Sequence, residues 1–181
     1  MQELKDTQSE TDTRNISIDR VGVKGLRFPI QIQDKLNRIQ STVATVSLAV
    51  DLPEEFKGTH MSRFVEALHQ HGPLLDVHTA LAIPRELLRR LSARRSHVEM
   101  EFPFFRAKNA PVTGIEGLMD YVVRFEMEAE ADNKLADFKL TVVVPVTTLC
   151  PCSQGHERLW GPQPARAGHL LRALRLPARL D

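Results

Sequence analysis

The 181-residue sequence has two cysteines, a net charge of only +1 and no long apolar run. Two cysteines spaced Cys-x-Cys cannot form the disulfide framework of a small secreted domain, so reduced thiols are expected. The near-neutral charge gives no support for a nucleic-acid partner. No apolar run approaches the roughly 18–20 residues that span a bilayer, so a membrane helix is not expected. Together these features predict a globular protein of the cytoplasm.

The composition divides the chain into three parts. Residues 1–15 are charged, hydroxyl-rich and without periodicity, which predicts a flexible arm and is untypical of a signal or transit peptide. Residues 16–153 carry the periodic apolar patterns of one domain. Residues 154–181 contain no Lys, Ile, Val, Phe or Tyr and are dominated by Arg, Leu, Ala, Pro and Gly. The sequence therefore changes character at about residue 154.

Periodicity within residues 16–153 predicts an α+β fold with an antiparallel sheet. Alternation predicts strands at 40–52, 96–105 and 118–131, the last with one wet face, and a β-branched run predicts a more buried strand at 140–146. Helical spacing from Phe64 predicts one helix that closes at Gly72-Pro73, and Pro84 is placed in the first turn of a second. The basic group Arg89, Arg90, Arg94 and Arg95 is most simply the solvated face of that second helix.

Two segments could hold an anion. Gly22 and Gly25 surround Lys24, so that backbone amides and an ammonium could approach one anion, although an ordinary glycine turn is the simpler interpretation. His60, Ser62 and Arg63 lie in a Gly-Thr-His-Met-Ser-Arg loop at a helix start, where they could bind phosphate. Alternatively, Thr59 or Ser62 only caps that helix.

Cys150 and Cys152 directly follow the predicted buried strand. Thiolates are strong ligands for zinc-like ions, and a strand end would hold them rigidly. The Cys-x-Cys spacing is nevertheless not the usual zinc spacing, so buried, unreactive cysteines are an equal alternative. The seven histidines are scattered, without a metal-binding pair on a helix.

Several ordered blocks resemble the type IB GTP cyclohydrolases. These blocks cover residues 12–15, 20–29, 57–64, 102–105, 108–112, 117–121 and 144–153. The resemblance implies a tunnelling fold, with paired helices on one face of an antiparallel sheet, in a barrel-like homo-oligomer with sites at subunit interfaces. It implies hydrolysis of GTP to 7,8-dihydroneopterin triphosphate and formate, on the way to tetrahydrofolate, with a divalent metal, zinc or manganese. By motif match Cys150 would be the catalytic, metal-binding thiolate, and Lys24, His60, Ser62 and Arg63 would be candidates for binding substrate.

The resemblance stops after Ser153, which implies an incomplete C-terminal half of the fold. Family members continue with a Lys and a Tyr-Gly-Ala-His-Asn-Gln-Arg block whose His binds metal, whereas this chain has His156 too early and Pro162 near the expected position. Residues 153–166 can be back-translated into codons that, after removal of one base, are read in a new frame. In that frame the same bases encode Ser-Lys-Ala-Met-Ser-Asp-Tyr-Gly-Ala-His-Asn-Gln-Arg. We therefore expect residues 154–181 to be an out-of-frame tail, largely unstructured, with at most a fraying helix over 170–176, and the chain to be inactive as it stands.

Two other functions are compatible with the sequence. The chain could be a non-catalytic remnant that joins a hetero-oligomer with an intact copy. It could also be a nitrile reductase of the same fold with a thiol nucleophile, which is disfavoured because that chemistry has a different set of motifs.

Overall fold

The computed structural model describes residues 16–33, 38–109, 113–131, 135–147 and 167–176. Residues 1–15, most of the Pro111 turn and the Cys150–Cys152 segment lie outside these ranges. The elements, in chain order, are β1 (Ile18–Gln33), β2 (Ile39–Leu52), α1 (Met61–Gln70), β3 (Leu74–Leu75), α2 (Val77–Leu91), β4 (Arg95–Asn109), β5 (Glu116–Glu130), β6 (Leu135–Thr147) and β7 (Ala167–Leu176).

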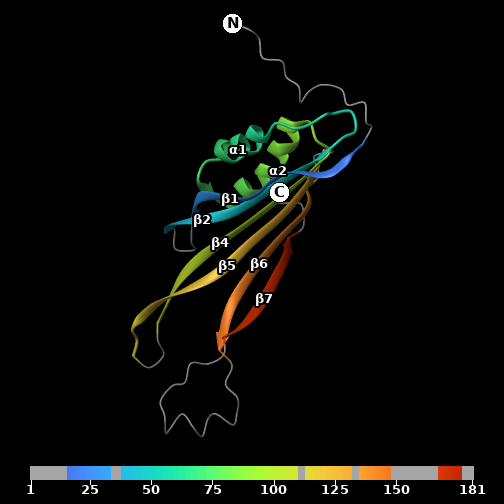
Figure 1. Cartoon of the computed structure of the whole chain (residues 1–181). Helices are drawn as coiled ribbons and strands as arrows, with labels where there is room; N and C mark the ends of the chain where they lie inside the picture. Colours follow the sequence, from blue (N-terminus) through green and yellow to red (C-terminus); the bar gives the residue numbers. More distant parts are fainter. Residues whose placement is uncertain (1–15, 34–37, 110–112, 132–134, 148–166, 177–181) are drawn as a thin grey trace.

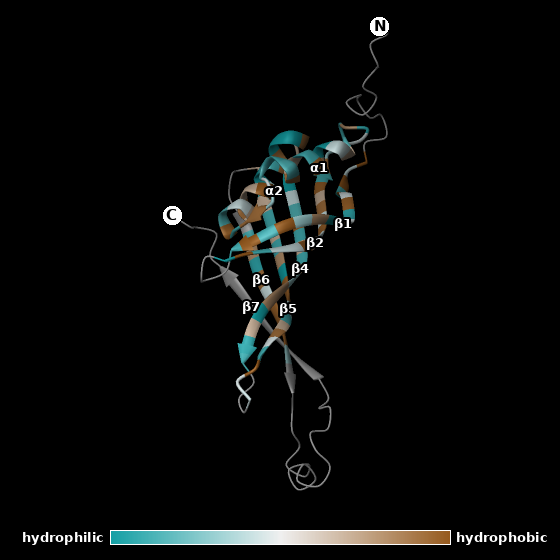
Figure 2. Cartoon of the chain, turned by 90° about the vertical axis from the view of Figure 1, so that its left-hand side faces the viewer, coloured by the Kyte–Doolittle hydropathy of each residue, from teal (hydrophilic) through white to brown (hydrophobic). Residues whose placement is uncertain are grey.

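The described strands form one sheet in the order β3-β1-β2-β4-β5-β6-β7, with α1 and α2 across one end of one face (Figures 1 and 2). All neighbouring strands are antiparallel except β1 and β3, which pair in parallel only at Gln31 and Ile32. This is the α+β arrangement of paired helices on an antiparallel sheet that the tunnelling fold implies, so the predicted fold class is confirmed.

The core lies between the helices and alternate residues of the central strands. Leu48 of β2 pairs with Val98 of β4, Val98 pairs with Met127 of β5, and Met127 pairs with Phe138 of β6. All four side chains are buried, as are Phe64 of α1 and Leu87 of α2. Because strand side chains alternate between faces, burying this set leaves the opposite face open.

The open face carries the polar partners of these strands. Arg124 of β5 makes ion pairs with Glu99 and Glu101 of β4, and Lys139 of β6 lies 2.6 Å from Glu126 of β5. The prediction that residues 118–131 form a strand with one wet face is confirmed. The strand at 140–146 is also confirmed, but it begins earlier, at Leu135, and Val142, Val143 and Val144 are half-buried rather than fully buried.

The second helix begins at Val77, so the prediction that Pro84 lies in its first turn is wrong. Asp76 is the N-cap, and its Oδ1 accepts a 2.7 Å hydrogen bond from the backbone N–H of Thr79. Pro84 lies buried inside the helix, and the hydroxyl of Ser96 donates to its carbonyl oxygen over 2.8 Å. A strong cap and burial of the apolar face therefore outweigh the interior proline.

The tail differs from expectation over residues 167–176, which form β7 and pair with β6 from Phe138 to Thr147. Leucines at the alternate positions 170, 174 and 176 are compatible with a strand, and the edge of β6 supplies unpaired backbone groups. The tail is therefore neither unstructured nor helical over this range. The remainder of 154–181 lies outside the described residues.

Candidate functional site

Lys24 lies in a β-bulge of β1 and not in a turn between two strands. Val23 pairs with Leu48 and Leu26 with Val46, so Lys24 and Gly25 together oppose a single residue of β2. Gly25 has φ +74°, a backbone conformation that glycine adopts without strain. The exposed Lys24 consequently lines a groove on the open face with Arg20, Gly22, His97 and Glu99.

Gly22 allows β1 to approach β2 closely beside this groove. A Cβ at this position would lie 1.9 Å from the carbonyl oxygen of Leu48. No side chain fits there without separating the two strands. The two glycines of this segment thus have different roles, close approach at Gly22 and the bulge at Gly25.

Beside Lys24, three strands place His97, Glu128 and Arg20 together. Nδ1 of His97 lies 2.8 Å from Oε1 of Glu128, while Nη2 of Arg20 lies 3.3 Å from the same nitrogen and 3.8 Å from Glu128 Oε1. A neutral imidazole whose Nδ1–H donates to Glu128 has Nε2 as an acceptor. A carboxylate-oriented histidine of this kind can act in proton transfer.

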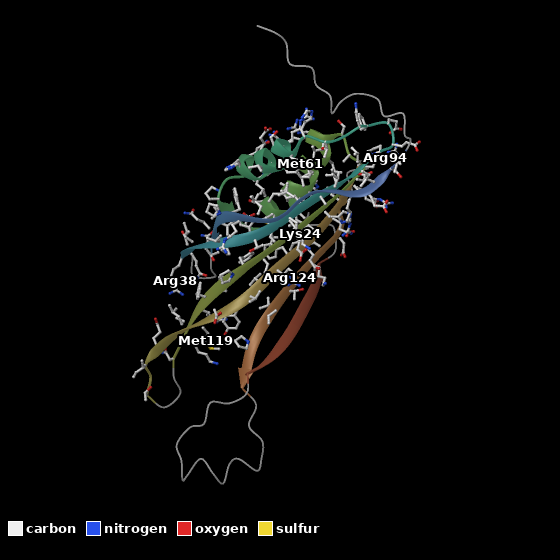
Figure 3. The ribbon with its side chains drawn as sticks, viewed as in Figure 1. Lys24, Arg38, Met61, Arg94, Met119 and Arg124 are labelled. Atoms are coloured by element: carbon white, nitrogen blue, oxygen red, sulfur yellow. The ribbon has the colours of Figure 1, made fainter. Side chains whose placement is uncertain are left out.

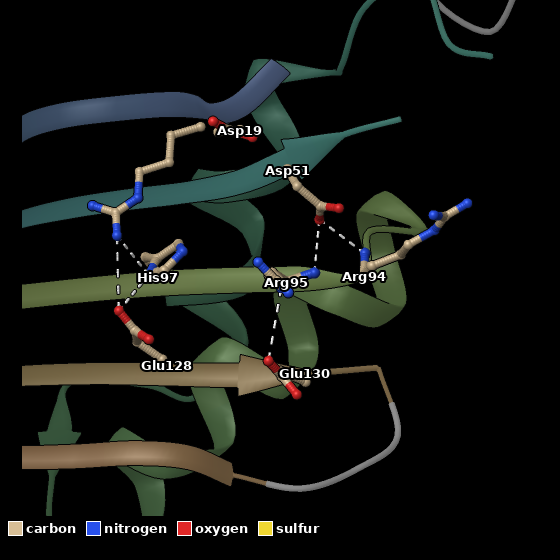
Figure 4. Close-up of a pocket in the computed structure, with 8 residues that line it drawn as sticks. Asp19, Asp51, Arg94, Arg95, His97, Glu128 and Glu130 are labelled. Carbon is tan, nitrogen blue, oxygen red and sulfur yellow. Dashed lines mark hydrogen bonds and ion pairs between the residues drawn. The ribbon is translucent and has the colours of Figure 1, made fainter. Parts of the chain in front are cut away.

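The same cluster opens into a hollow of about 680 Å³ at one end of the open face, which we call the His97 hollow (Figure 4). Oδ1 of Asp51 accepts hydrogen bonds of 2.9 and 2.7 Å from the backbone N–H groups of Arg94 and Arg95. Nε of Arg95 lies 3.7 Å from Glu130. The lining residues are Asp19, Arg20, Asp51, Arg94, Arg95, His97, Glu128 and Glu130.

The mixed charge of the His97 hollow is suited to polar ligands. Its arginines are largely exposed and make only long ion pairs, whereas Asp51 and Glu128 already accept hydrogen bonds within the chain. Sequence patterns missed this hollow because His97 was one of seven scattered histidines. Only the β4–β5 register, which pairs His97 with Glu128, brings the two together.

The loop at the start of α1 does not have the cap that the simpler prediction gave it. His60 is the N-cap, without a capping hydrogen bond from its side chain, so neither Thr59 nor Ser62 caps the helix. Ser62 is exposed. Arg63 is half-buried, and its Nη1 donates a 3.0 Å hydrogen bond to the carbonyl oxygen of Arg90 at the end of α2. One Arg63 donor therefore joins the two helices.

The structure does not bring the predicted substrate-binding residues together within one chain. Lys24 lies with His97 and Glu99 on the open face, whereas α1, with His60, Ser62 and Arg63, belongs to the helical layer on the other face. Figure 3 shows Lys24 in β1 and Met61 in the helical layer. The two groups therefore belong to opposite faces of the sheet within one chain.

The basic group predicted as a solvated helix face divides between two structures. Arg89 and Arg90 belong to α2, where both bind Glu86, and Arg90 also reaches Glu66 of α1. Arg94 and Arg95 follow the helix, which ends at Leu91, and line the His97 hollow. The prediction holds for Arg89, which is 67% exposed, but not for Arg90, which is 23% exposed and bridges the two helices. It is wrong for Arg94 and Arg95, because the left-handed Ser92 ends the helix before them.

Cys150, the predicted catalytic metal ligand, lies outside the described residues, as does Cys152. The described residues contain no group of three or more His, Cys, Asp or Glu side chains that could hold a metal ion. They therefore do not themselves form a metal centre, and no chemical step can be assigned to a metal from them.

Comparison with known proteins decides the family. The model of the type I GTP cyclohydrolase FolE2 family matches residues 4–172. The chain belongs to this FolE2 family. It is 97% identical over 154 residues to a GTP cyclohydrolase FolE2 of Akkermansia muciniphila, covering 85% of this chain and 58% of that relative. It is 48% identical over 151 residues to the protein of the same name from Fervidobacterium nodosum, covering 83% and 57%.

A third FolE2 relative, from an Azoarcus species, is 45% identical over 151 residues, which cover 83% of this chain and 56% of the relative. The chain thus spans a little more than half the length of the FolE2 proteins it matches. Family membership confirms the resemblance carried by the sequence blocks. Among the described helices, none is long and apolar enough to cross a membrane.

Proposed function

We propose that the intact form of this FolE2 protein is a metal-dependent, cytoplasmic GTP cyclohydrolase. It would convert GTP to 7,8-dihydroneopterin triphosphate and formate, the first step of tetrahydrofolate biosynthesis. The observation that carries the proposal is the family match over residues 4–172, which includes the Val144–Ser153 block. The open, polar face with Lys24 and the His97 hollow supports binding of a polar, charged substrate.

In this proposal Cys150 is the catalytic thiolate and binds zinc or manganese, and Lys24, His60, Ser62 and Arg63 contact GTP. The exposure of Lys24 and Ser62 supports the second assignment, while the hydrogen bond from Arg63 to Arg90 gives Arg63 a structural role as well.

The distances along the sheet support a homo-oligomer with active sites between subunits. The His97 hollow lies beside Glu128, which pairs with Asp137 near the start of β6. The end of β6, at Thr147, lies ten residues further, or roughly 33 Å along the strand. The end of β6 and the His97 hollow are therefore far apart within one chain, so we propose that a site using both takes them from two copies.

We further propose that residues from about Gln154 onward are translated out of frame. In support, the match to the Akkermansia relative spans 154 of the 181 residues, although the family model extends to residue 172. The chain lacks the family His block after Ser153, so we expect weak metal binding and no turnover. Resequencing the coding DNA tests this directly, and an uninterrupted frame without the family codons would reject it.

The experiment on function uses the chain and its frame-restored form, each with zinc and with manganese. Formate and pterin release from GTP are measured together with bound metal by mass spectrometry. We expect turnover only in the restored form, and in that form Cys150→Ala should remove both turnover and the metal, while Lys24→Ala should raise KM more than it lowers kcat. Undiminished catalysis by Cys150→Ala would overturn the assignment.

A second candidate function is a non-catalytic subunit in a hetero-oligomer with an intact FolE2 copy, favoured by the missing His block. Co-expression of the two forms with different tags tests it. Recovery of a mixed complex of fixed stoichiometry supports this role, and separate elution of the two forms rejects it.

A further inference from the structure

One residue of α2, Arg90, contacts a whole polar stripe of α1. The two helices lie side by side on the same face of the sheet (Figure 1). Nη1 of Arg90 lies 2.9 Å from Oε2 of Glu66, and its Nη2 donates to Oε1 of Gln70. The backbone carbonyl oxygen of Arg90 accepts the 3.0 Å hydrogen bond from Nη1 of Arg63. Because Arg63, Glu66 and Gln70 are spaced i, i+3 and i+7, they lie along one face of α1, and Arg90 binds all three.

Arg90 is also held from its own helix. Its Nε donates to Oε1 of Glu86, one turn earlier in α2, and the side chain of Glu86 is only 10% exposed. With all three guanidinium nitrogens bound, the side chain of Arg90 is fixed. Its carbonyl oxygen belongs to the last turn of α2, where carbonyl groups have no partner within the helix and carry partial negative charge. The guanidinium of Arg63 therefore meets a fixed acceptor of the opposite charge.

The hydrogen bond to Arg90 uses only one edge of the Arg63 guanidinium. Nη1 is occupied, whereas Nε and Nη2 make no hydrogen bond or ion pair with any of the described residues. These two nitrogens form the other edge of the planar fork, and their parallel N–H groups match two oxygens of a phosphate group. Arg63 thus keeps the edge that is suited to a phosphate.

Arg90 also keeps Glu66 away from Arg63. These two residues of α1 are three positions apart, a spacing at which Arg and Glu side chains form ion pairs on a helix. In the structure the carboxylate of Glu66 is bound by Arg90 instead. Without the side chain of Arg90, Glu66 would be free to turn to the open edge of Arg63 and compete there with an anionic ligand.

We propose that Arg90 is a positioning residue for substrate binding, which holds Arg63 with its Nε–Nη2 edge available to a phosphate group of GTP. The inference rests on the proposed function, in which Arg63 contacts GTP, and it adds a residue of α2 that does not touch the ligand. The carbonyl oxygen of Arg90 orients Arg63, and its guanidinium binds the competing Glu66. Both effects concern binding and neither concerns a chemical step.

Isothermal titration calorimetry of the full chain with inorganic tripolyphosphate measures this effect without catalysis. Arg63→Ala should weaken binding at least about tenfold, since a bidentate, charge-assisted contact is lost. Arg90→Ala should weaken it about three- to tenfold, because the ligand must then order the side chain of Arg63 itself. Arg89→Ala is the matched control, since it removes the same charge and another partner of Glu86, yet Arg89 makes no bond to the described residues of α1. Because that pair is exposed, Arg89→Ala should change the affinity less than about twofold.

A double variant distinguishes positioning from a general stabilisation of the helices. Arg90→Ala/Glu66→Gln should recover most of the affinity that Arg90→Ala loses, because the competing carboxylate is gone. A change that only loosened the two helices would not be reversed by a second change at the same contact. Circular dichroism checks folding. If Arg90→Ala does not fold, Arg90→Gln replaces it, since that side chain cannot bind Glu66 and Gln70 together.

Kinetics of the frame-restored form separate this inference from the proposed function. Arg90→Ala should raise KM for GTP by the factor found with tripolyphosphate and change kcat less than about twofold. Absence of turnover in the restored form, with the calorimetric pattern as expected, would refute the proposed function and leave the positioning role intact. Equal effects of Arg89→Ala and Arg90→Ala, no recovery in the double variant, or no binding of tripolyphosphate to the full chain would overturn the positioning role.

Discussion

Replacement of Gly22 by alanine should be among the most destabilising single changes in this sheet. The new Cβ would lie 1.9 Å from the Leu48 carbonyl oxygen, 2.7 Å from the Ala49 Cα and 2.8 Å from the Leu48 carbonyl carbon, all backbone atoms that cannot rotate away. An ordinary carbon–oxygen contact is about 3.3 Å or more. The strands β1 and β2 must therefore separate locally by more than an ångström.

That separation would break the two or three backbone hydrogen bonds nearest to Gly22. Each contributes about 1 kcal/mol, so we expect the free energy of unfolding to fall by about 3 kcal/mol. This is a large part of the roughly 5–15 kcal/mol that stabilises a typical domain. Guanidinium unfolding followed by far-ultraviolet circular dichroism measures the change as a shift of the midpoint.

Gly25→Ala is the matched control, because it lies three residues away in the same strand. Its new Cβ would have nothing within 4 Å, and only the positive φ of +74° opposes it. The expected loss is about 1 kcal/mol. If Gly22→Ala were no more destabilising than Gly25→Ala, the argument from the close approach of the strands would be refuted.

Two further predictions concern the helices and pH. The side-chain hydrogen bond from Arg89, with a second from Arg90, lowers the pKa of Glu86 from 4.5 to about 2. This pairing stabilises the fold above pH 4.5, and the stabilisation is lost as the pH falls towards 2. Because Arg89 is 67% exposed, Glu86→Gln should lower the free energy of unfolding by only about 1 kcal/mol at pH 7. Denaturation at pH 2 should show no difference between the variant and the parent chain. The hydrogen bond from the backbone N–H of Thr79 lowers the pKa of Asp76 below 3.8. Asp76→Ala should therefore lower the free energy of unfolding by about 1 kcal/mol at pH 7 and by less below pH 3.8. A loss in urea unfolding that did not depend on pH would contradict the role of Asp76 as the cap.

Much of the sheet could be predicted because alternation in β2, β4 and β5 is clear and each strand has one buried face. The start of α2 could not be placed from Pro84, since the cap at Asp76 and the buried leucines outweigh the proline. β7 could not be anticipated either. Its pairing depends on the open edge of β6, and pairing between distant segments leaves little local signal.

Only some residues of the candidate site could be predicted, because the pairing of strands is not visible in the sequence. Motif blocks identified the family and singled out Lys24, but they could not place it on the opposite face of the sheet from His60. The pairing of His97 with Glu128 depends on residues 31 positions apart that meet only through the β4–β5 register. The pattern of a single sequence shows which residues each strand buries. To predict a site formed by several strands, the register between those strands must also be known.

The bulge at Lys24 and Gly25 also affects how β1 behaves as the outer strand. Among the described residues, β3 covers β1 only at Gln31 and Ile32, so most of its outward backbone groups are open to another chain. An irregular, positively charged strand with Pro29 in its second half is a poor template for further strands. The irregularity that positions Lys24 should therefore also hinder fibril growth from this edge.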